Sequence, residues 1–360
     1  MSATERPQHW SRRELLRWLG LAALGGCAGR RRPIDDHPDR TLPPLERELA
    51  IYNWSDYVAP DTIPNFEREF GVRVTYDVFE SNEEMLAKLQ AGARGYDLVV
   101  AGGNFIAPLV ALGLVARPSW RYVPNLINLS PRFRGLPFDP GNDFTVPYQW
   151  AITGIAWRRD LLPSPPIGWA LFHDSSLRGK LTQLDDMRDA IGAWLRYRRR
   201  SINSTDPAFL AEARADAIWA KANLKAYISA PVKAQLVTGD VWAAQLWNGD
   251  ATQARAEQPA IEFTIPAEGS SMWLDNLVLT SRAPHPRAAH EFMNYILRPD
   301  VGAAISAATG YGTPNDAALS LLTDPVRYPS PLELERLEWA ADLGRATALW
   351  DQIWTEIKAA

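Results

Sequence analysis

The stretch between residues 51 and 100 constrains the fold most, because its apolar pattern predicts a β-α-β-α-β unit. Residues 72–78 alternate apolar and polar side chains as a half-buried strand does. Residues 61–71 and 81–92 have the apolar spacing of helices. Residues 96–100 are mostly apolar, as in a strand buried on both faces. This order predicts a parallel sheet with helical crossovers.

The two predicted helices have recognisable start and stop signals. Asp61 is expected to cap the first helix, and Ser81 with Glu84 forms the capping-box signature at the start of the second. Gly71 and Gly92 are expected to end them, because glycine adopts the left-handed conformation that closes many helices.

The loop after the first predicted strand contains two aromatic residues and an acid: Trp54, Asp56 and Tyr57. Open α/β sheets bind ligands at the carboxyl ends of their strands. Aromatic faces together with carboxylates favour an organic cation. The exit of the third strand, residues 101–105, is expected beside this loop, since both leave the same end of a parallel sheet.

The composition is that of a soluble globular protein large enough for two domains. The chain has 360 residues, of which 46% are hydrophobic and 22% charged. Its net charge is −4, without a basic stripe interleaved with aromatics, so nucleic acid is not an expected partner. Fifteen tryptophans exceed what core packing requires and suggest stacking surfaces.

The N-terminus resembles an export signal. Residues 11–17 resemble a twin-arginine motif, residues 18–26 form a short apolar core, and residues 24–27 look like a lipobox ending at Cys27. We expect residues 1–26 to be removed, Cys27 to be acylated, and residues 27–47 to form a tether. Several acyl chains would anchor the protein stably. The alternative is a short internal helix with an unmodified thiol.

Residues 98–116 form a second apolar run, of nineteen residues without a charge. Its length suggests a transmembrane helix. Glycines at positions 102, 103 and 113 and the proline at 108 instead predict a strand, a loop and a short helix.

Catalytic signatures are weak. The sequence has no nucleotide-binding glycine motif, no metal-type His/Cys cluster and no free nucleophilic thiol besides Cys27. Asp186 and Asp189 are three residues apart at the start of a predicted helix that runs to about Arg198, so they project side by side. Glycosidase carboxylates instead flank a bond from opposite sides. We therefore predict a protein that is not an enzyme and uses no metal or cofactor.

Several motifs along the chain together resemble the periplasmic spermidine/putrescine-binding proteins of bacterial polyamine ABC transporters. The resemblance extends over residues 49–351. The matching segments are residues 52–57, 80–83, 96–100, 136–140, 247–249, 273–275, 297–301 and 310–315.

The resemblance implies an α/β, two-lobed periplasmic-binding-protein fold of type II. Each lobe would be a mostly parallel sheet flanked by helices, and hinge segments such as residues 144–158 would cross between the lobes. The first lobe would comprise residues 48–152 and 275–318, and the second residues 153–274 and 319–360. The implied partners are a polyamine and the permease subunits of an ABC transporter, with the binding protein acting as a monomer outside the cytoplasmic membrane.

The resemblance also implies the ligand-binding residues. Asp275 would be the central carboxylate, and Asp189 would stand where the family commonly has a glutamate. The expected ligand-binding residues are Trp54, Ser55, Tyr57, Asp186, Asp189, Trp247, Asp250, Trp273, Asp275 and Tyr311.

Three positions depart from the family pattern: Gly102 and Asn104 replace a serine and a tyrosine, and Ala340 replaces a glutamine. These departures leave open which polyamine is bound. Two other functions also remain open, a sugar-binding protein of similar architecture and a polyamine receptor for signalling. Four acids among the expected ligand-binding residues argue against a neutral sugar.

Overall fold

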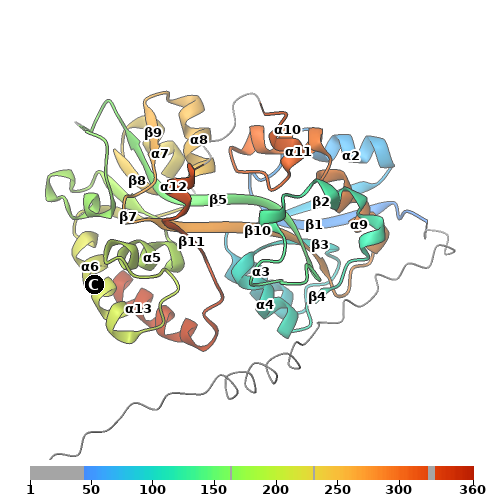
Figure 1. Ribbon diagram of the computed structural model, residues 1–360, viewed down its shortest axis with the longest axis horizontal. Helices are drawn as coiled ribbons and strands as arrows, with labels where there is room; N and C mark the ends of the chain where they lie inside the picture. Colours follow the sequence, from blue (N-terminus) through green and yellow to red (C-terminus); the bar gives the residue numbers. More distant parts are fainter. Residues whose placement is uncertain (1–43, 163, 230–231, 323–328) are drawn as a thin grey trace, which may run out of the picture. The chain divides into compact units, whose positions relative to one another are not determined.

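The computed structural model describes residues 44–162, 164–229, 232–322 and 329–360 (Figure 1). The predicted export signal, Cys27 and most of the predicted tether lie outside the described residues. Among the residues that are described, no helix is both long and apolar enough to cross a membrane.

The predicted β-α-β-α-β unit is confirmed and forms the centre of what we call the first lobe. Strand β1 pairs in parallel with β2 on one side and with β3 on the other. Its elements are β1 (Glu48–Trp54), α2 (Thr62–Phe70), β2 (Arg73–Phe79), α3 (Asn82–Gln90), β3 (Leu98–Gly102) and α4 (Gly103–Ala111). Residues 98–116, which are long enough to suggest a membrane span, thus form β3, α4 and the short strand β4 (Val115–Ala116).

Alternation along the strands of the first lobe separates two apolar layers. Ile51 of β1 packs on one face against α2 and α9 (Pro286–Ile296), where Phe66 and Phe292 lie. Its neighbour Tyr52 packs on the other face, where Met85 of α3 is buried. Successive side chains of a strand point to opposite faces, so helices on both sides are needed to cover this sheet.

Two long antiparallel strands, β5 (Thr145–Arg158) and β10 (Ser270–Thr280), connect the two halves of the fold (Figure 1). Strand β10 pairs with β3, and β5 pairs with β10 through Ile152. From Thr153 onward β5 pairs with β8 (Ala243–Trp247), and from Ile155 also with β9 (Ile261–Thr264). The main path through the sheet is β2-β1-β3-β10-β5-β8-β6-β7, with β4 and β11 pairing beside β10 and β9 beside β5.

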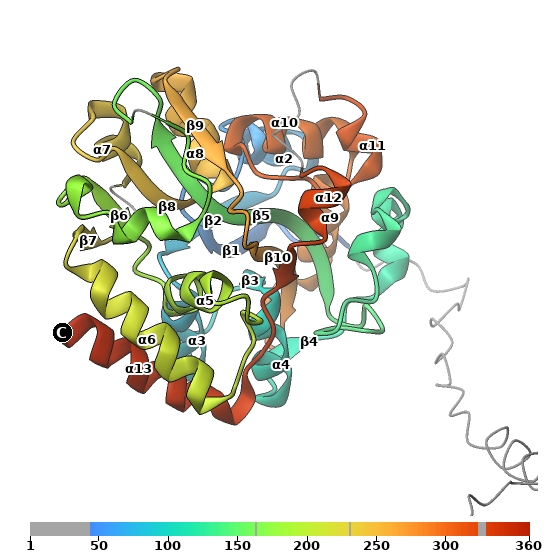
Figure 2. The ribbon, with the colours of Figure 1, turned by 60° about the vertical axis from the view of Figure 1, so that its left-hand side comes forward.

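What we call the second lobe is built on β6, β7 and β8, with β6 parallel to both neighbours. Helices α5, α6 and α13 pack together on one face around Trp194 and Trp350 (Figure 2). Helices α7 and α8 cover the other face around Leu246. The remaining bounds are β6 (Leu181–Gln183), β7 (Leu224–Tyr227), α5 (Met187–Tyr197), α6 (Pro207–Lys221), α7 (Val232–Thr238), α8 (Asn248–Glu257) and α13 (Thr347–Ala359).

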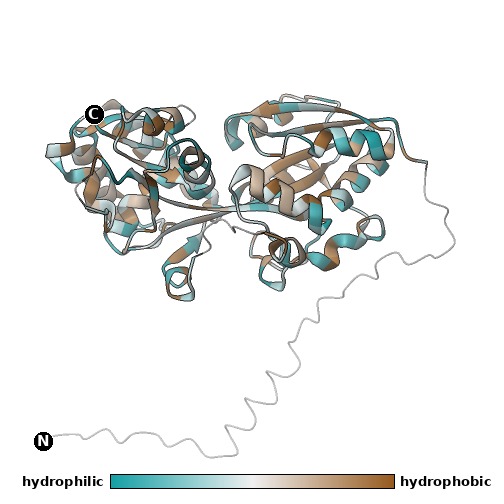
Figure 3. Ribbon diagram, turned by 90° about the horizontal axis from the view of Figure 1, so that it is seen from above, coloured by the Kyte–Doolittle hydropathy of each residue, from teal (hydrophilic) through white to brown (hydrophobic). Residues whose placement is uncertain are grey.

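Figure 3 shows hydrophobic residues concentrated on the strands and the helix faces that pack on them.

The other elements complete the two lobes. The remaining helices are α10 (Pro299–Thr309), α11 (Asp316–Leu319) and α12 (Pro331–Leu334), and the remaining strand is β11 (Leu337–Trp339). The 3₁₀ turns are Trp120–Tyr122, Pro124–Asn128, Pro131–Phe133, Trp169–His173, Ser175–Leu177 and Gly344–Ala346.

The structure corrects two of the predicted helix signals. Asp61 precedes α2, but its side chain makes no capping hydrogen bond, and its own backbone is helical. Ser81 accepts from the backbone N–H of Glu84 as predicted, whereas the Glu84 carboxylate accepts from Glu80 N–H rather than from Ser81. Both expected glycine stops have positive φ, 64° at Gly71 and 85° at Gly92.

Candidate ligand-binding site

Alternate residues of β10 place three functional groups on one face of that strand. Ser271, Trp273 and Asp275 are two residues apart, so their side chains project to the same side. A register irregularity follows Asp275 where β10 pairs with β5. Trp273 and Asp275 are the centre of what we call the acid–aromatic cluster. This cluster comprises the ten residues expected to bind ligand: Trp54, Ser55, Tyr57, Asp186, Asp189, Trp247, Asp250, Trp273, Asp275 and Tyr311.

Asp275 is half-buried and receives one described hydrogen bond, from the hydroxyl of Tyr57 at 2.7 Å. No basic side chain of the described residues forms an ion pair with it. Burial raises the pKa of Asp275 to about 6, and the Tyr57 hydrogen bond opposes this shift. The charged carboxylate therefore has a neutral partner but no described counter-ion.

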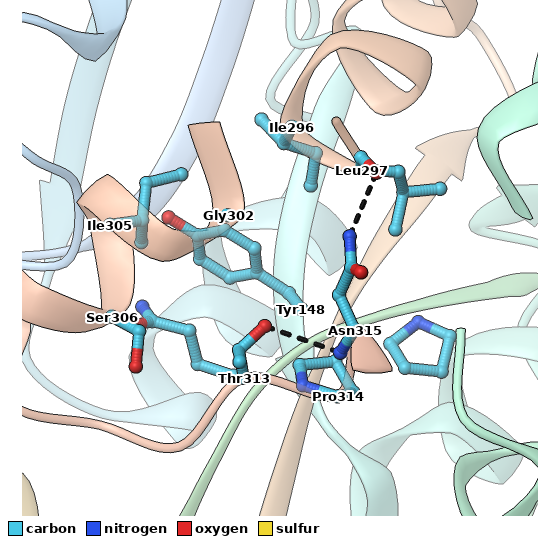
Figure 4. A pocket seen from close by; sticks show the side chains of 11 residues that line it. Tyr148, Ile296, Leu297, Gly302, Ile305, Ser306, Thr313, Pro314 and Asn315 are labelled. Carbon is cyan, nitrogen blue, oxygen red and sulfur yellow. Dashed lines mark hydrogen bonds between the residues drawn. The ribbon is translucent and has the colours of Figure 1, made fainter. Parts of the chain in front are cut away.

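Tyr57 is held in place from behind by strand β5. Its backbone carbonyl accepts from the hydroxyl of Tyr148 and from the side-chain amide of Gln149. The same two residues line a small pocket, together with Asn315 and neighbouring residues (Figure 4). Its volume of about 10 Å³ admits at most one water molecule, so this pocket is a packing defect behind the cluster.

Tyr311 links the segment after α10 to α8. Its hydroxyl donates to the Asp250 carboxylate at 3.0 Å, and its ring lies edge-on to Tyr57 with centroids 5.1 Å apart. A Cβ atom at Gly249 would lie 2.4 Å from the Tyr311 ring, so only glycine permits this approach. Burial raises the pKa of Asp250, and Lys233 is the strongest opposing influence.

Asp189 accepts hydrogen bonds from four side chains. One carboxylate oxygen accepts from Thr153 at 2.6 Å, from Ser271 at 2.7 Å and from the indole of Trp273 at 3.1 Å. The other accepts from the indole of Trp247 at 2.9 Å. The carboxylate therefore fixes the orientation of both tryptophan rings. With a residue exposure of 2%, it is almost completely removed from solvent.

All four donors to Asp189 are uncharged, so they satisfy its hydrogen-bonding capacity without neutralising it. Burial raises its pKa to about 7, the nearby Asp186 charge adds to this effect, and the hydrogen bonds oppose it. A buried carboxylate in this environment would be stabilised by a nearby positive charge, which its four hydrogen-bond donors do not supply.

Asp186 is the N-cap of α5 and accepts from the backbone N–H of Asp189 at 2.8 Å. The preceding Asp185 is exposed and pairs with Lys358 at 3.2 Å. The buried Arg188 influences Asp186 electrostatically but gives its own hydrogen bonds to Ala341 and Asn203. Asp186 and Asp189 are thus linked through the backbone, as expected of two residues in one helical turn.

The side chains of two expected residues make no described hydrogen bond to the rest of the cluster. Trp54 ends β1 and packs against Phe79 at a centroid distance of 4.5 Å, and its indole N–H has no partner among the described residues. Ser55 is exposed, and the structure gives it no hydrogen bond to the cluster.

The three departures from the family pattern have the following environments. Gly102 donates its backbone N–H to Asn82, and Ala340 donates its own to Met272. Asn104 is 8% exposed, and its side-chain oxygen has no partner among the described residues. This amide oxygen is an unused acceptor at the exit of β3.

Sequence reasoning missed three residues of this network, Ser271, Thr153 and Lys233, whereas Asp56 belongs to the acid–aromatic loop already recognised in the sequence. Ser271 could have been found, because it alternates with Trp273 and Asp275 along one strand. Thr153 lies in an apolar strand, and Lys233 belongs to none of the motifs found in the sequence. Lys233 approaches carboxylates of both Asp56 and Asp250 at 3.7 Å. In the described part of the chain, no His, Cys, Asp and Glu side chains group as a metal site would require.

Comparison with known proteins identifies the family. A family model described as bacterial extracellular solute-binding protein matches residues 62–328. The spermidine/putrescine-binding periplasmic protein of Escherichia coli (strain K12) is 32% identical over 357 residues, covering 97% of this chain and 99% of the relative.

Solved structures agree with the sequence comparison. A putative spermidine/putrescine ABC transporter protein from Listeria monocytogenes has a TM-score of 0.82 and 31% identity, covering 87% of this chain and 99% of that one. The Tp0655 lipoprotein of Treponema pallidum has a TM-score of 0.81 and 28% identity, covering 86% and 99%. The matching family model describes solute-binding proteins and the Escherichia coli relative is named as a polyamine-binding protein, which confirms the prediction that the chain is not an enzyme. The chain belongs to the bacterial extracellular solute-binding proteins and is similar, over nearly its whole length, to their periplasmic spermidine/putrescine-binding members.

Proposed function

We propose that this protein is a lipid-anchored extracytoplasmic receptor that captures a polyamine of the putrescine or spermidine type and delivers it to an ABC transporter. The observation that supports this most is Asp275, a half-buried carboxylate bonded to a neutral tyrosine and lacking a described ion-pair partner. A ligand ammonium would supply the missing charge through a charge-assisted hydrogen bond.

The aromatic residues suit the rest of such a ligand. A polyamine consists of ammonium groups separated by methylenes, and tryptophan faces can cover the methylenes while attracting the cations. Each cation–π contact contributes roughly 0.5–2 kcal/mol. Asp189 holds Trp247 and Trp273 by their indole N–H groups, which fixes where these faces lie. We assign Asp189 mainly this positioning role, with its charge acting on the ligand at longer range.

Closure of the lobes would couple binding to recognition by the transporter. We propose that the lobes comprise residues 48–152 with 275–318 and residues 153–274 with 319–360, and that β5 and β10 form the hinge. Tyr57 belongs to one lobe and Asp189 to the other. A cation between them favours the closed state by its differential affinity, which is the condition for ligand-driven closure.

A neutral sugar is a poorer ligand for this cluster. Tryptophan faces also stack on sugar rings, but Asp275 and Asp189 would remain buried without a counter-charge, which is costly. A role in signalling rather than transport would use the same ligand chemistry.

The first prediction concerns ligand class. Calorimetry of the mature chain should give saturable heats with putrescine, spermidine or both, because they bring the charge that the carboxylates lack, and no heat with maltose. Heat with maltose and none with putrescine, spermidine or agmatine would refute the proposal.

The second prediction concerns Asp275. Asp275→Asn preserves shape and removes the charge, leaving a ligand ammonium buried against an amide. Breaking one partner of a buried pair costs about 3–5 kcal/mol, so affinity should fall by roughly a hundredfold or more. Asp185→Asn is the matched control, because Asp185 is exposed and pairs only with Lys358 among the described residues. An equal loss of affinity in both variants would show that the binding site is not at Asp275.

Asp275 also predicts a pH dependence of binding. Its pKa of about 6 in the free protein should fall when an ammonium binds, because the cation stabilises the charged form. Affinity should therefore be full well above pH 6 and decline as the pH falls through that value. Calorimetry in buffers of different ionisation enthalpy should detect proton release near pH 6 in the wild type and less in Asp275→Asn.

The third prediction concerns the stability of the ligand-free protein. The folded-state pKa of Asp189, about 7, lies above its ordinary value, so its contribution to stability is full at low pH and lost as the pH rises through 7. Thermal melts from pH 5 to 8 should show a shallower decline in Asp189→Asn than in the wild type or in Asp185→Asn. Identical slopes in all three would contradict this assignment.

The fourth prediction concerns the N-terminus. Mass spectrometry of the membrane fraction should find Cys27 acylated at the start of the mature chain, and Arg12→Lys with Arg13→Lys should block export. An unmodified Cys27 thiol or an intact N-terminus in that fraction would exclude the lipoprotein proposal. The similar Treponema protein is itself described as a lipoprotein.

A further inference from the structure

Lys233 places an ammonium group of the protein itself at one end of the acid–aromatic cluster. Its Nζ atom lies 3.7 Å from a carboxylate oxygen of Asp56 and 3.7 Å from one of Asp250. It also donates to the side-chain oxygen of Gln253 at 2.9 Å. Asp56 follows β1 in the first lobe, whereas Asp250 and Gln253 lie on α8 in the second. One lysine therefore serves acceptors from both lobes.

A short series of contacts connects Lys233 to the central carboxylate. Asp250 accepts from Tyr311, the Tyr311 ring meets Tyr57, and Tyr57 donates to Asp275. The Asp250 side chain is 15% exposed and that of Lys233 is 27% exposed, whereas that of Asp56 is 79% exposed. Because screening by water is weaker at Asp250, its attraction for Lys233 is the stronger of the two.

Positive charge is thus supplied unevenly along the cluster. A lysine ammonium is the same chemical group as the end of an aliphatic amine, so Lys233 uses acceptors that a ligand ammonium would otherwise use. Asp250 already has a cation nearby. Asp275 and Asp189 have neutral hydrogen-bond partners and no ion pair with a described basic residue.

We propose that Lys233 is a specificity-determining residue that limits the number of charges on the bound ligand. This inference rests on the proposed polyamine-binding function. A diamine can bind with one ammonium at Asp275 and the other within the field of Asp189, while Lys233 stays in place. An additional ammonium beside Asp250 must approach Lys233 or displace it, and like charges in a partly desolvated site repel. The site therefore selects diamines over triamines.

The test compares putrescine and spermidine binding to the full mature chain by calorimetry at one ionic strength. Lys233→Met preserves side-chain length and helix propensity while removing the charge. It should raise the affinity for spermidine relative to putrescine by roughly tenfold, because the longer ligand brings one more charge toward the vacated position. Lys233→Arg retains the charge and should keep the wild-type ratio.

Lys225→Met is the matched control. Lys225 lies in β7 of the same lobe and pairs with Asp240, away from the described contacts of the cluster. It should leave the ratio unchanged, which separates the local effect of Lys233 from a change in net charge. Lys233→Gln provides a second neutral variant if circular dichroism shows that Lys233→Met is misfolded.

The outcomes separate this inference from the function on which it rests. If the wild type binds amines and the neutral Lys233 variants leave the ratio unchanged, the inference fails and polyamine binding stands. Equal weakening of putrescine and spermidine binding also overturns it, because Lys233 would then act only by linking the two lobes through Asp56 and Asp250. If neither the wild type nor any variant binds an amine, both proposals fail. Binding of spermidine only after Lys233 is neutralised would support both.

Discussion

The antiparallel pairing of β5 with β10 is the interaction on which the fold and the site both depend. These strands are shared by the two lobes, and the residues that contact ligand in our proposal are arranged around them. Strand β10 supplies Trp273 and Asp275 on one face, and β5 supplies Thr153 to Asp189 and supports Tyr57 from behind. A shift of register by one residue would turn all of these side chains to the opposite face.

The site also depends on how the buried carboxylate of Asp189 and the half-buried carboxylate of Asp275 are satisfied. Neutral donors remove the penalty of unmade hydrogen bonds, but they do not cancel charge. Asp189 has four such donors and Asp275 one, and burial raises the pKa of both. A bound ligand cation would therefore stabilise the charged forms of both carboxylates. The electrostatic cost of these charges in the ligand-free protein is the same free energy that a ligand cation recovers when it binds.

The sequence predicted the elements well because their signals are local. The alternation at residues 72–78 and the glycines at 71 and 92 concern neighbours in the chain. Asp61 failed as a side-chain cap because its backbone is itself helical. The partners of Asp189 could not be predicted in the same way: Thr153 and Ser271 lie 36 and 82 residues away, and only the folded sheet brings them together.

The short side chain at position 189 connects these observations. The resemblance in sequence implies a glutamate at this position in the family. Aspartate is one methylene shorter, and its carboxylate is enclosed by Thr153, Ser271 and two tryptophan indoles. In our proposal, direct contact with an ammonium is therefore left chiefly to Asp275, while Asp189 acts through the orientation of the rings and through its electrostatic field. In our proposal, Lys233 supplies the charge beside Asp250, so the number of cations that the site can hold depends on Lys233 and on the enclosed Asp189 together.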